Sequence, residues 1–192
     1  MSNFIKTAAK IIGYALVMGG AIIKFPQIIK VIFNKSVVGI SFISVILELS
    51  TNILSSGYCI YKGNSFSLYG ENVFIGVQML MIVLLFVAFG NGSKSLYFTA
   101  LFSMLAAAYY ISDPHHLPTF MIEQGIVVQT LLICISRMSQ IIEIYRLKST
   151  GSLAFTTWIL TLLGNIARIS TILVEASSDI KFLFSIVSVA VL

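Results

Sequence analysis

Seven long apolar segments, separated by short polar breaks, limit what this chain can fold into. Hydrophobic residues make up 58% of the sequence and charged residues only 10%, against about 25% charged residues in soluble domains. A helix of about 20 apolar residues crosses a bilayer and satisfies its own backbone hydrogen bonds there. We therefore expect an all-α integral membrane protein with seven spans. The segments cover roughly residues 11–33, 38–61, 70–90, 95–112, 118–145, 152–174 and 180 onward.

The last segment is short for a span. Only 13 residues follow Asp179, whereas about 20 are needed to cross the hydrocarbon. Either the sequence is a fragment cut inside its seventh helix, or that helix stops short; we favour the fragment.

The basic residues indicate which loops face the cytosol. The first, third and fifth loops carry five Lys and Arg residues and the other side carries four, so the positive-inside rule places the first set in the cytosol. These residues stand at helix ends, scattered along a chain of net charge +5, and this distribution argues against nucleic-acid binding.

The sequence contains an internal duplication. Residues 24–53 align without gaps to residues 137–166, at a constant offset of 113. Polar matches carry most of the weight, because polar residues are rare inside spans. These matches pair Gln27 with Gln140, Lys35-Ser36 with Lys148-Ser149, and Asn52 with Asn165.

The offset predicts how the two copies are arranged. It leaves an odd number of helices between the units, so both have the same orientation, as in transporters built from parallel repeats. We expect a first three-helix repeat over 1–90, a linker helix over 91–117 and a second three-helix repeat over 118–192.

A three-helix unit used twice, with Pro26-Gln27 in its first helix followed by Lys35-Ser36, resembles the PQ-loop superfamily. That superfamily includes the SWEET sugar transporters and the lysosomal cystine exporter. Gly70-Glu71 with Gln78, and the segment 164–175, make the sequence more similar to the mannose-P-dolichol utilization defect family. The second motif departs from the pattern, because it has Ser139 where the first has proline.

The resemblance implies a seven-helix, SWEET-like bundle in the endoplasmic reticulum membrane. It implies a role in using dolichol-phosphate-mannose and dolichol-phosphate-glucose as lumenal sugar donors for N-linked glycans and glycolipid (GPI) anchors. The partners would be these or other lipids and lumenal glycosyltransferases. The alternative is a PQ-loop transporter of a small solute, a sugar or an amino acid.

Two cations sit at the same place in the two repeats. Lys24 and Glu48 lie about equally far from the first loop, so an antiparallel helix pair would join them in an ion pair. Arg137 aligns with Lys24, but Thr161 aligns with Glu48. Arg137 then either binds an anion, for which a guanidinium suits phosphate, or extends to the interface.

The other candidate binding residues have two readings each. Pro26 removes a helical hydrogen bond and acts as a hinge or as a fixed kink. Arg168 forms a salt bridge with Glu71 or Glu175, or contacts phosphate or sugar. The remaining candidates either line a cavity or hydrogen-bond between helices; they are Gln27, Gln140, Asn52 and Asn165. Three further glutamines inside spans are expected to hydrogen-bond between helices; they are Gln78, Gln124 and Gln129.

Catalytic patterns do not stand out in the sequence. We find no nucleophile–base pair, glycine-rich phosphate loop or metal-ligand spacing. Cys59 and Cys134 both fall inside predicted spans, which does not suggest a disulfide framework. We therefore expect no enzymatic activity, no cofactor and no metal.

Overall fold

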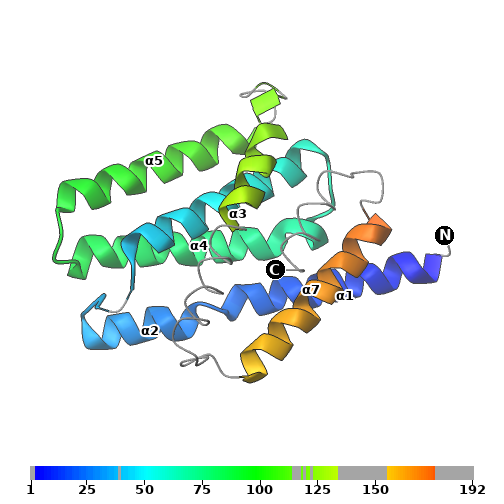
Figure 1. Cartoon of the computed structure of the whole chain (residues 1–192), viewed down its shortest axis with the longest axis horizontal. Coiled ribbons are helices and arrows are strands. Elements are labelled where there is room, and N and C mark those ends of the chain that lie inside the picture. Colours follow the sequence, from blue (N-terminus) through cyan, green and yellow to red (C-terminus); the bar gives the residue numbers. More distant parts are fainter. Residues whose placement is uncertain are drawn as a thin grey trace. The chain divides into compact units, whose positions relative to one another are not determined.

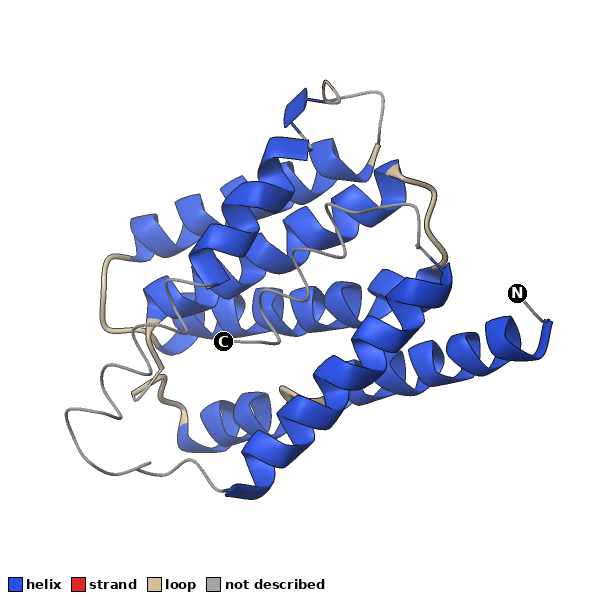
Figure 2. Ribbon diagram, turned by 45° about the vertical axis from the view of Figure 1, so that its right-hand side comes forward, coloured by secondary structure: helices blue, strands red, loops and turns tan. Residues whose placement is uncertain are grey.

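The computed structural model describes residues 3–38, 40–113, 118, 120–121, 123–133 and 155–175. These belong to two compact units, residues 17–122 and residues 1–16 with 123–192, which are described separately. Figures 1 and 2 show the described chain as helices joined by short connections. The main helices are α1 (Asn3–Ile22), α2 (Phe25–Asn34), α3 (Phe42–Tyr61), α4 (Phe66–Phe89), α5 (Lys94–Ser112) and α7 (Phe155–Glu175).

Four of the described helical stretches are long and apolar enough to cross a membrane, which confirms the first four predicted segments as membrane-capable. The first of them joins α1 and α2 across a break. α7 falls in the sixth predicted segment, the fifth is helical over 123–133, and the seventh lies outside the described residues. The four stretches are Thr7–Asn34, Phe42–Tyr61, Phe66–Phe89 and Lys94–Ser112.

Within residues 17–122, α4 is the central helix. It packs against α2, α3 and α5, and α5 also packs against α3. The most apolar of the four membrane-capable stretches is α4 itself, and Met79, Ile82 and Val83 on it are almost fully buried. A helix in contact with three neighbours leaves little room for polar side chains, so a buried polar group on α4 is informative.

An aromatic cluster fixes which helix ends lie together. Phe42 begins α3, Phe86 lies near the end of α4 and Tyr97 lies near the start of α5. The ring centroid of Phe42 is 5.1 Å from that of Phe86 and 4.8 Å from that of Tyr97. The first and third loops are therefore at the same end of these helices, as the predicted topology requires.

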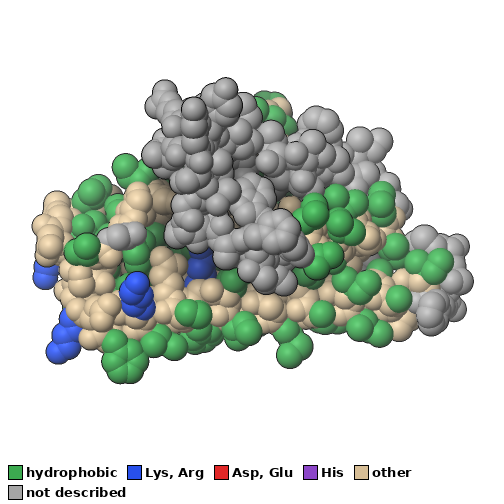
Figure 3. Space-filling view, turned by 60° about the horizontal axis from the view of Figure 1, so that its bottom comes forward, with side chains coloured by type: hydrophobic (Ala, Val, Ile, Leu, Met, Phe, Trp, Pro, Cys, Tyr) green, Lys and Arg blue, Asp and Glu red, His purple; other side chains and the backbone are tan. Residues whose placement is uncertain are grey.

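Large hydrophobic side chains remain exposed on the outer helices. Met18 on α1 is 73% exposed and Phe33 on α2 is 83% exposed, and Figure 3 shows many such side chains beside lysine and arginine. Exposed apolar surface of this extent is typical of proteins whose surroundings are lipid.

Candidate functional site: the break in the first span

The first span is interrupted at Ile23 and Lys24, where α1 ends and α2 has not yet begun. Pro26 lies in the first turn of α2, where its missing N–H costs nothing. The helix restarts with a hydrogen bond from the Ile28 N–H to the Lys24 carbonyl, at 3.0 Å. The predicted effect of Pro26 on the helix is confirmed, and it takes the form of a break between two helices.

Gln78 of α4 fills the gap in the hydrogen-bond ladder. In an unbroken helix the Lys24 N–H would donate to the Gly20 carbonyl. Here the Lys24 N–H donates to Oε1 of Gln78 at 2.8 Å, and Nε2 of Gln78 donates to the Gly20 carbonyl at 2.7 Å. The carboxamide thus replaces the missing bond with two, which keeps both backbone groups satisfied away from water.

A close approach of helices lets Gln78 reach the break. A Cβ at Gly20 would lie 2.6 Å from Cγ of Glu71 and 3.2 Å from its Cα. Gln78 is 3% exposed, and its Nε2 also donates to the Phe74 carbonyl on its own helix, at 3.0 Å. Its side chain is therefore held from both sides, which fixes the register of α4 against the first span.

Lys24 and Glu48 form the predicted ion pair. Nζ of Lys24 lies 2.8 Å from Oε1 and 3.0 Å from Oε2 of Glu48. The lysine side chain is 22% exposed and the glutamate side chain 41% exposed, so the pair is half-buried. The charge that the first span carries at its break is neutralised by α3.

The backbone of α3 is anchored beside this pair. The Glu48 carbonyl accepts a hydrogen bond from Oγ1 of Thr51 at 2.8 Å and one from Nδ2 of Asn52 at 2.7 Å. Asn52, which was predicted to line a cavity, is 9% exposed and uses its amide nitrogen within its own helix.

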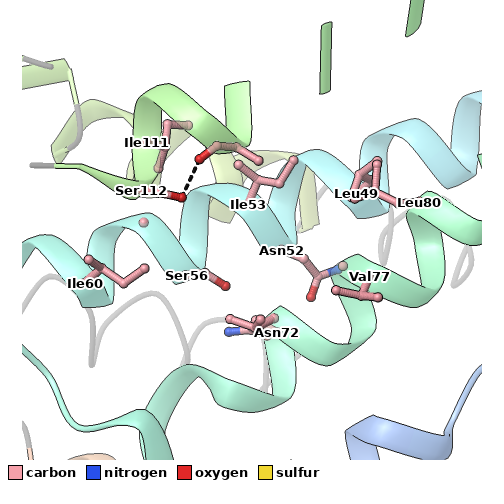
Figure 4. A pocket seen from close by; sticks show the side chains of 14 residues that line it. Leu49, Asn52, Ile53, Ser56, Ile60, Asn72, Val77, Leu80, Ile111 and Ser112 are labelled. Atoms are coloured by element: carbon pink, nitrogen blue, oxygen red, sulfur yellow. Dashed lines mark hydrogen bonds between the residues drawn. The ribbon is translucent and has the colours of Figure 1, made fainter. Parts of the chain in front are cut away.

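A pocket of about 230 Å³ lies between α3, α4 and α5, and Asn52 is on its wall (Figure 4). Its wall is mostly apolar. The close contact of Gly57 with Ile111, where a Cβ would overlap the isoleucine, borders it. The polar side chains on the wall are Asn52, Ser56, Asn72 and Ser112.

The remaining predicted site residues lie on α2, on α7 or outside the described residues. Gln27 is half-buried on α2, and Asn165 and Arg168 are half-buried on α7, in the other unit. Arg137 and Gln140 lie outside the described residues. The ion pair of Arg168 with Glu71 or Glu175 stays a prediction.

The sequence reading assigned Gln78 to hydrogen bonding between helices and did not connect it with the break. The helix-to-helix bonds are confirmed, but their target is Gly20 and Lys24. Two features of the sequence could have indicated this contact: an amide, Gln78, in the middle of an apolar span, and a glycine, Gly20, four residues before Lys24.

Comparison with known families identifies the two halves. The PQ loop repeat matches residues 8–68 and again residues 126–181. The first match contains the break and its ion pair, and the second contains Arg137, Asn165 and Arg168. No solved structure matches the chain. The two matches cover more than half of a chain that has several membrane-capable helices, so the protein is a multi-pass membrane protein that belongs to the PQ-loop repeat family.

Proposed function

We propose that this protein acts in the endoplasmic reticulum membrane in the use of dolichol-phosphate-mannose and dolichol-phosphate-glucose by lumenal transferases. It binds the phosphate headgroup of the lipid-linked sugar and flips the lipid or presents it. The role is of the kind implied by the likeness to the mannose-P-dolichol utilization defect family, and the chain itself performs no catalysis.

One observation carries the proposal: the cation of the first repeat has an acid, whereas the second repeat has a threonine at the position aligned with that acid. Glu48 lies 2.8 Å from Lys24, whereas the residue aligned with Glu48 beside Arg137 is Thr161. A desolvated cation without a carboxylate favours an anionic ligand. The planar guanidinium of arginine matches the oxygens of a phosphate with two parallel hydrogen bonds.

The proposed architecture puts that anion between two parallel three-helix repeats. The repeats span 1–90 and 118–192, residues 91–117 link them, and the seventh helix completes the second. In this arrangement Lys24 and Arg137 face each other across the central axis, so that Arg137 carries the surplus charge. The candidate polar lining near them is Pro26, Gln27, Gln140, Asn52, Asn165 and Arg168.

Transport of a small neutral solute is the second candidate, and the break itself favours it. Discontinuous helices at mid-membrane form solute sites in many transporters. At this break Lys24 is neutralised by Glu48, and the side chain of Gln78 hydrogen-bonds to its backbone. A sugar or an amino acid would use the same polar residues without needing a free cation.

Proteoliposomes separate the two functions. The purified chain is reconstituted and supplied either with short-chain dolichol-phosphate-mannose or with free mannose and neutral amino acids. We expect movement or saturable binding of the lipid-linked sugar, competed by dolichol phosphate, and no uptake of the free solutes. Solute uptake with no effect on the lipid-linked sugar would establish the transporter instead.

A further inference from the structure

The pocket between α3, α4 and α5 contains a buried hydroxyl group. Ser56 is 8% exposed, and its Oγ has no hydrogen-bond partner among the residues that the structure describes. Figure 4 shows this oxygen directed into the space between α3 and α4. Leaving a buried hydroxyl unbonded is costly, so the group indicates a ligand that completes it.

Two amides beside Ser56 have their nitrogen atoms occupied. Nδ2 of Asn52 donates to the Glu48 carbonyl at 2.7 Å, and Nδ2 of Asn72 donates to Oγ of Ser55 at 3.0 Å. Each amide keeps an oxygen with free lone pairs. The other hydroxyl on the wall, that of Ser112, donates to the Ala108 carbonyl at 2.6 Å. The polar part of the wall therefore offers acceptors and one unbonded hydroxyl, which suits a ligand that donates a single hydrogen bond.

The rest of the wall is aliphatic, and its size limits the ligand. It is formed by Leu49, Ile53, Ile60, Val77, Leu80 and Ile111. A cavity of about 150 Å³ binds benzene, with about six heavy atoms, so about 230 Å³ holds about nine. The aliphatic part of the wall favours an apolar chain over water, and a free sugar has too many hydroxyl groups for this wall.

We propose that this pocket binds a medium-chain alcohol, with an apolar chain of about eight carbons and one hydroxyl group. The hydroxyl donates to an amide oxygen of Asn52 or Asn72 and accepts from Ser56, while the chain lies against the aliphatic wall. The site lies within one unit of the chain. It shares Asn52 with the candidate dolichol lining, but the proposal does not rest on the dolichol function.

The test uses the purified full chain and an octanol that carries a photoreactive diazirine. Labelling is mapped by mass spectrometry, with 1-octanol and n-nonane as competitors, because the two have the same number of heavy atoms and only one has a hydroxyl. We expect labels on α3, α4 and α5 that 1-octanol removes at about three- to tenfold lower concentration than n-nonane.

Two variants and two matched controls locate the site. A Cβ at Gly76 would have one neighbour, the Asn52 Cβ at 3.8 Å, so Gly76→Leu fills the pocket and should abolish the competed labelling. Ser56→Ala, which is nearly isosteric, should raise the octanol concentration needed about three- to tenfold. The controls are Gly164→Leu, where a Cβ meets none of the described residues within 4 Å, and Ser103→Ala on the exposed side of α5; both should behave as the parent.

The proposal fails if the label spreads over the exposed apolar surface, or if n-nonane competes as well as 1-octanol. Labelling that is unchanged in Ser56→Ala overturns the role of the hydroxyl, even where Gly76→Leu does not fold.

Discussion

In the first repeat, Nζ of Lys24 lies 2.8 Å from the carboxylate of Glu48. The backbone N–H of Lys24 donates a hydrogen bond to the side chain of Gln78. In the second repeat the aligned positions hold Arg137 and Thr161. A duplicated unit that keeps its cation and loses its acid retains a charge that the first copy neutralises. Under the proposed function, the first copy uses its charge for structure and the second uses its charge for a ligand.

The two repeats also differ at the proline. Pro26 accompanies a break whose free backbone groups are bound by Gln78, whereas the second repeat has Ser139. Because Gln78 ties the two ends of the break together, we interpret the first break as a fixed element, and a symmetric pair of hinges is not expected.

The largest effect is expected at Arg137. Arg137→Gln should abolish the rescue of cells defective in dolichol-sugar use, because it removes the cation that we propose binds phosphate. Arg137→Lys keeps the charge but loses the planar fork, so it should rescue in part.

The readout is the glycan profile of the rescued cells, with the amount of protein in the endoplasmic reticulum measured alongside. Full rescue by Arg137→Gln at parental protein levels would leave Arg137 as an interface anchor.

The next largest effect is expected on stability, from the Lys24–Glu48 ion pair of the first repeat. Glu48→Gln leaves Lys24 without its acid, and the free energy of unfolding should fall. The loss should lie between the ~1 kcal/mol of an exposed pair and the ~3–5 kcal/mol of a fully buried one, because the two side chains are 22% and 41% exposed.

Thermal unfolding in detergent measures this loss. The double exchange of Lys24→Glu with Glu48→Lys should recover part of it, since the opposite charges still meet. A Glu48→Gln protein that is as stable as the parent would show that the pair contributes nothing.

A smaller effect is expected from the glutamine at the break. Gln78→Leu leaves the Lys24 N–H and the Gly20 carbonyl unbonded, and each buried unsatisfied group costs about 1–3 kcal/mol. Burial of the leucine side chain returns about 1.5–3 kcal/mol, so the net loss should be smaller than that of the ion pair. The matched control is Gln124→Leu on an exposed helical position, which should not change stability. Equal unfolding temperatures for both variants would contradict the bridging role.

We expect no glycosylation at either of the two sequons in the chain. Asn34-Lys35-Ser36 and Asn91-Gly92-Ser93 lie in the first and third loops, and both asparagines are exposed. Exposed asparagines of this kind would be glycosylated if those loops were lumenal. If neither carries a glycan, the reason is that the loops face the cytosol and not that the asparagines are buried. A mobility shift that endoglycosidase removes would invert the topology.

Part of this site was predictable because it depends on position along single helices. Pro26 interrupts any helix that contains it, and two charges equally far from one short loop meet when the helices pair. Hence the break and the Lys24–Glu48 pair followed from the sequence. The bond between Gln78 and Gly20 joins residues 58 positions apart and depends on how α4 is rotated, which periodicity in a uniformly apolar helix does not determine.

The pocket's polar lining could not be predicted from the sequence for a similar reason. Asn52 was expected at a cavity, but Ser56 and Asn72 were not. Serine in a span usually bonds the backbone of its own helix, as Ser50 and Ser112 do. Whether a hydroxyl is left unbonded depends on the neighbours that surround it, and here these are supplied by three helices.

The charge difference between the repeats is tested most directly by giving the second repeat the acid of the first. Thr161→Glu should neutralise Arg137 internally. Equilibrium binding of short-chain dolichol-phosphate-mannose to the purified protein in liposomes measures the result. We expect Thr161→Glu to lose binding with little change in unfolding temperature, whereas Glu48→Gln should retain binding. Parental affinity in a folded Thr161→Glu protein would show that Arg137 does not bind the phosphate.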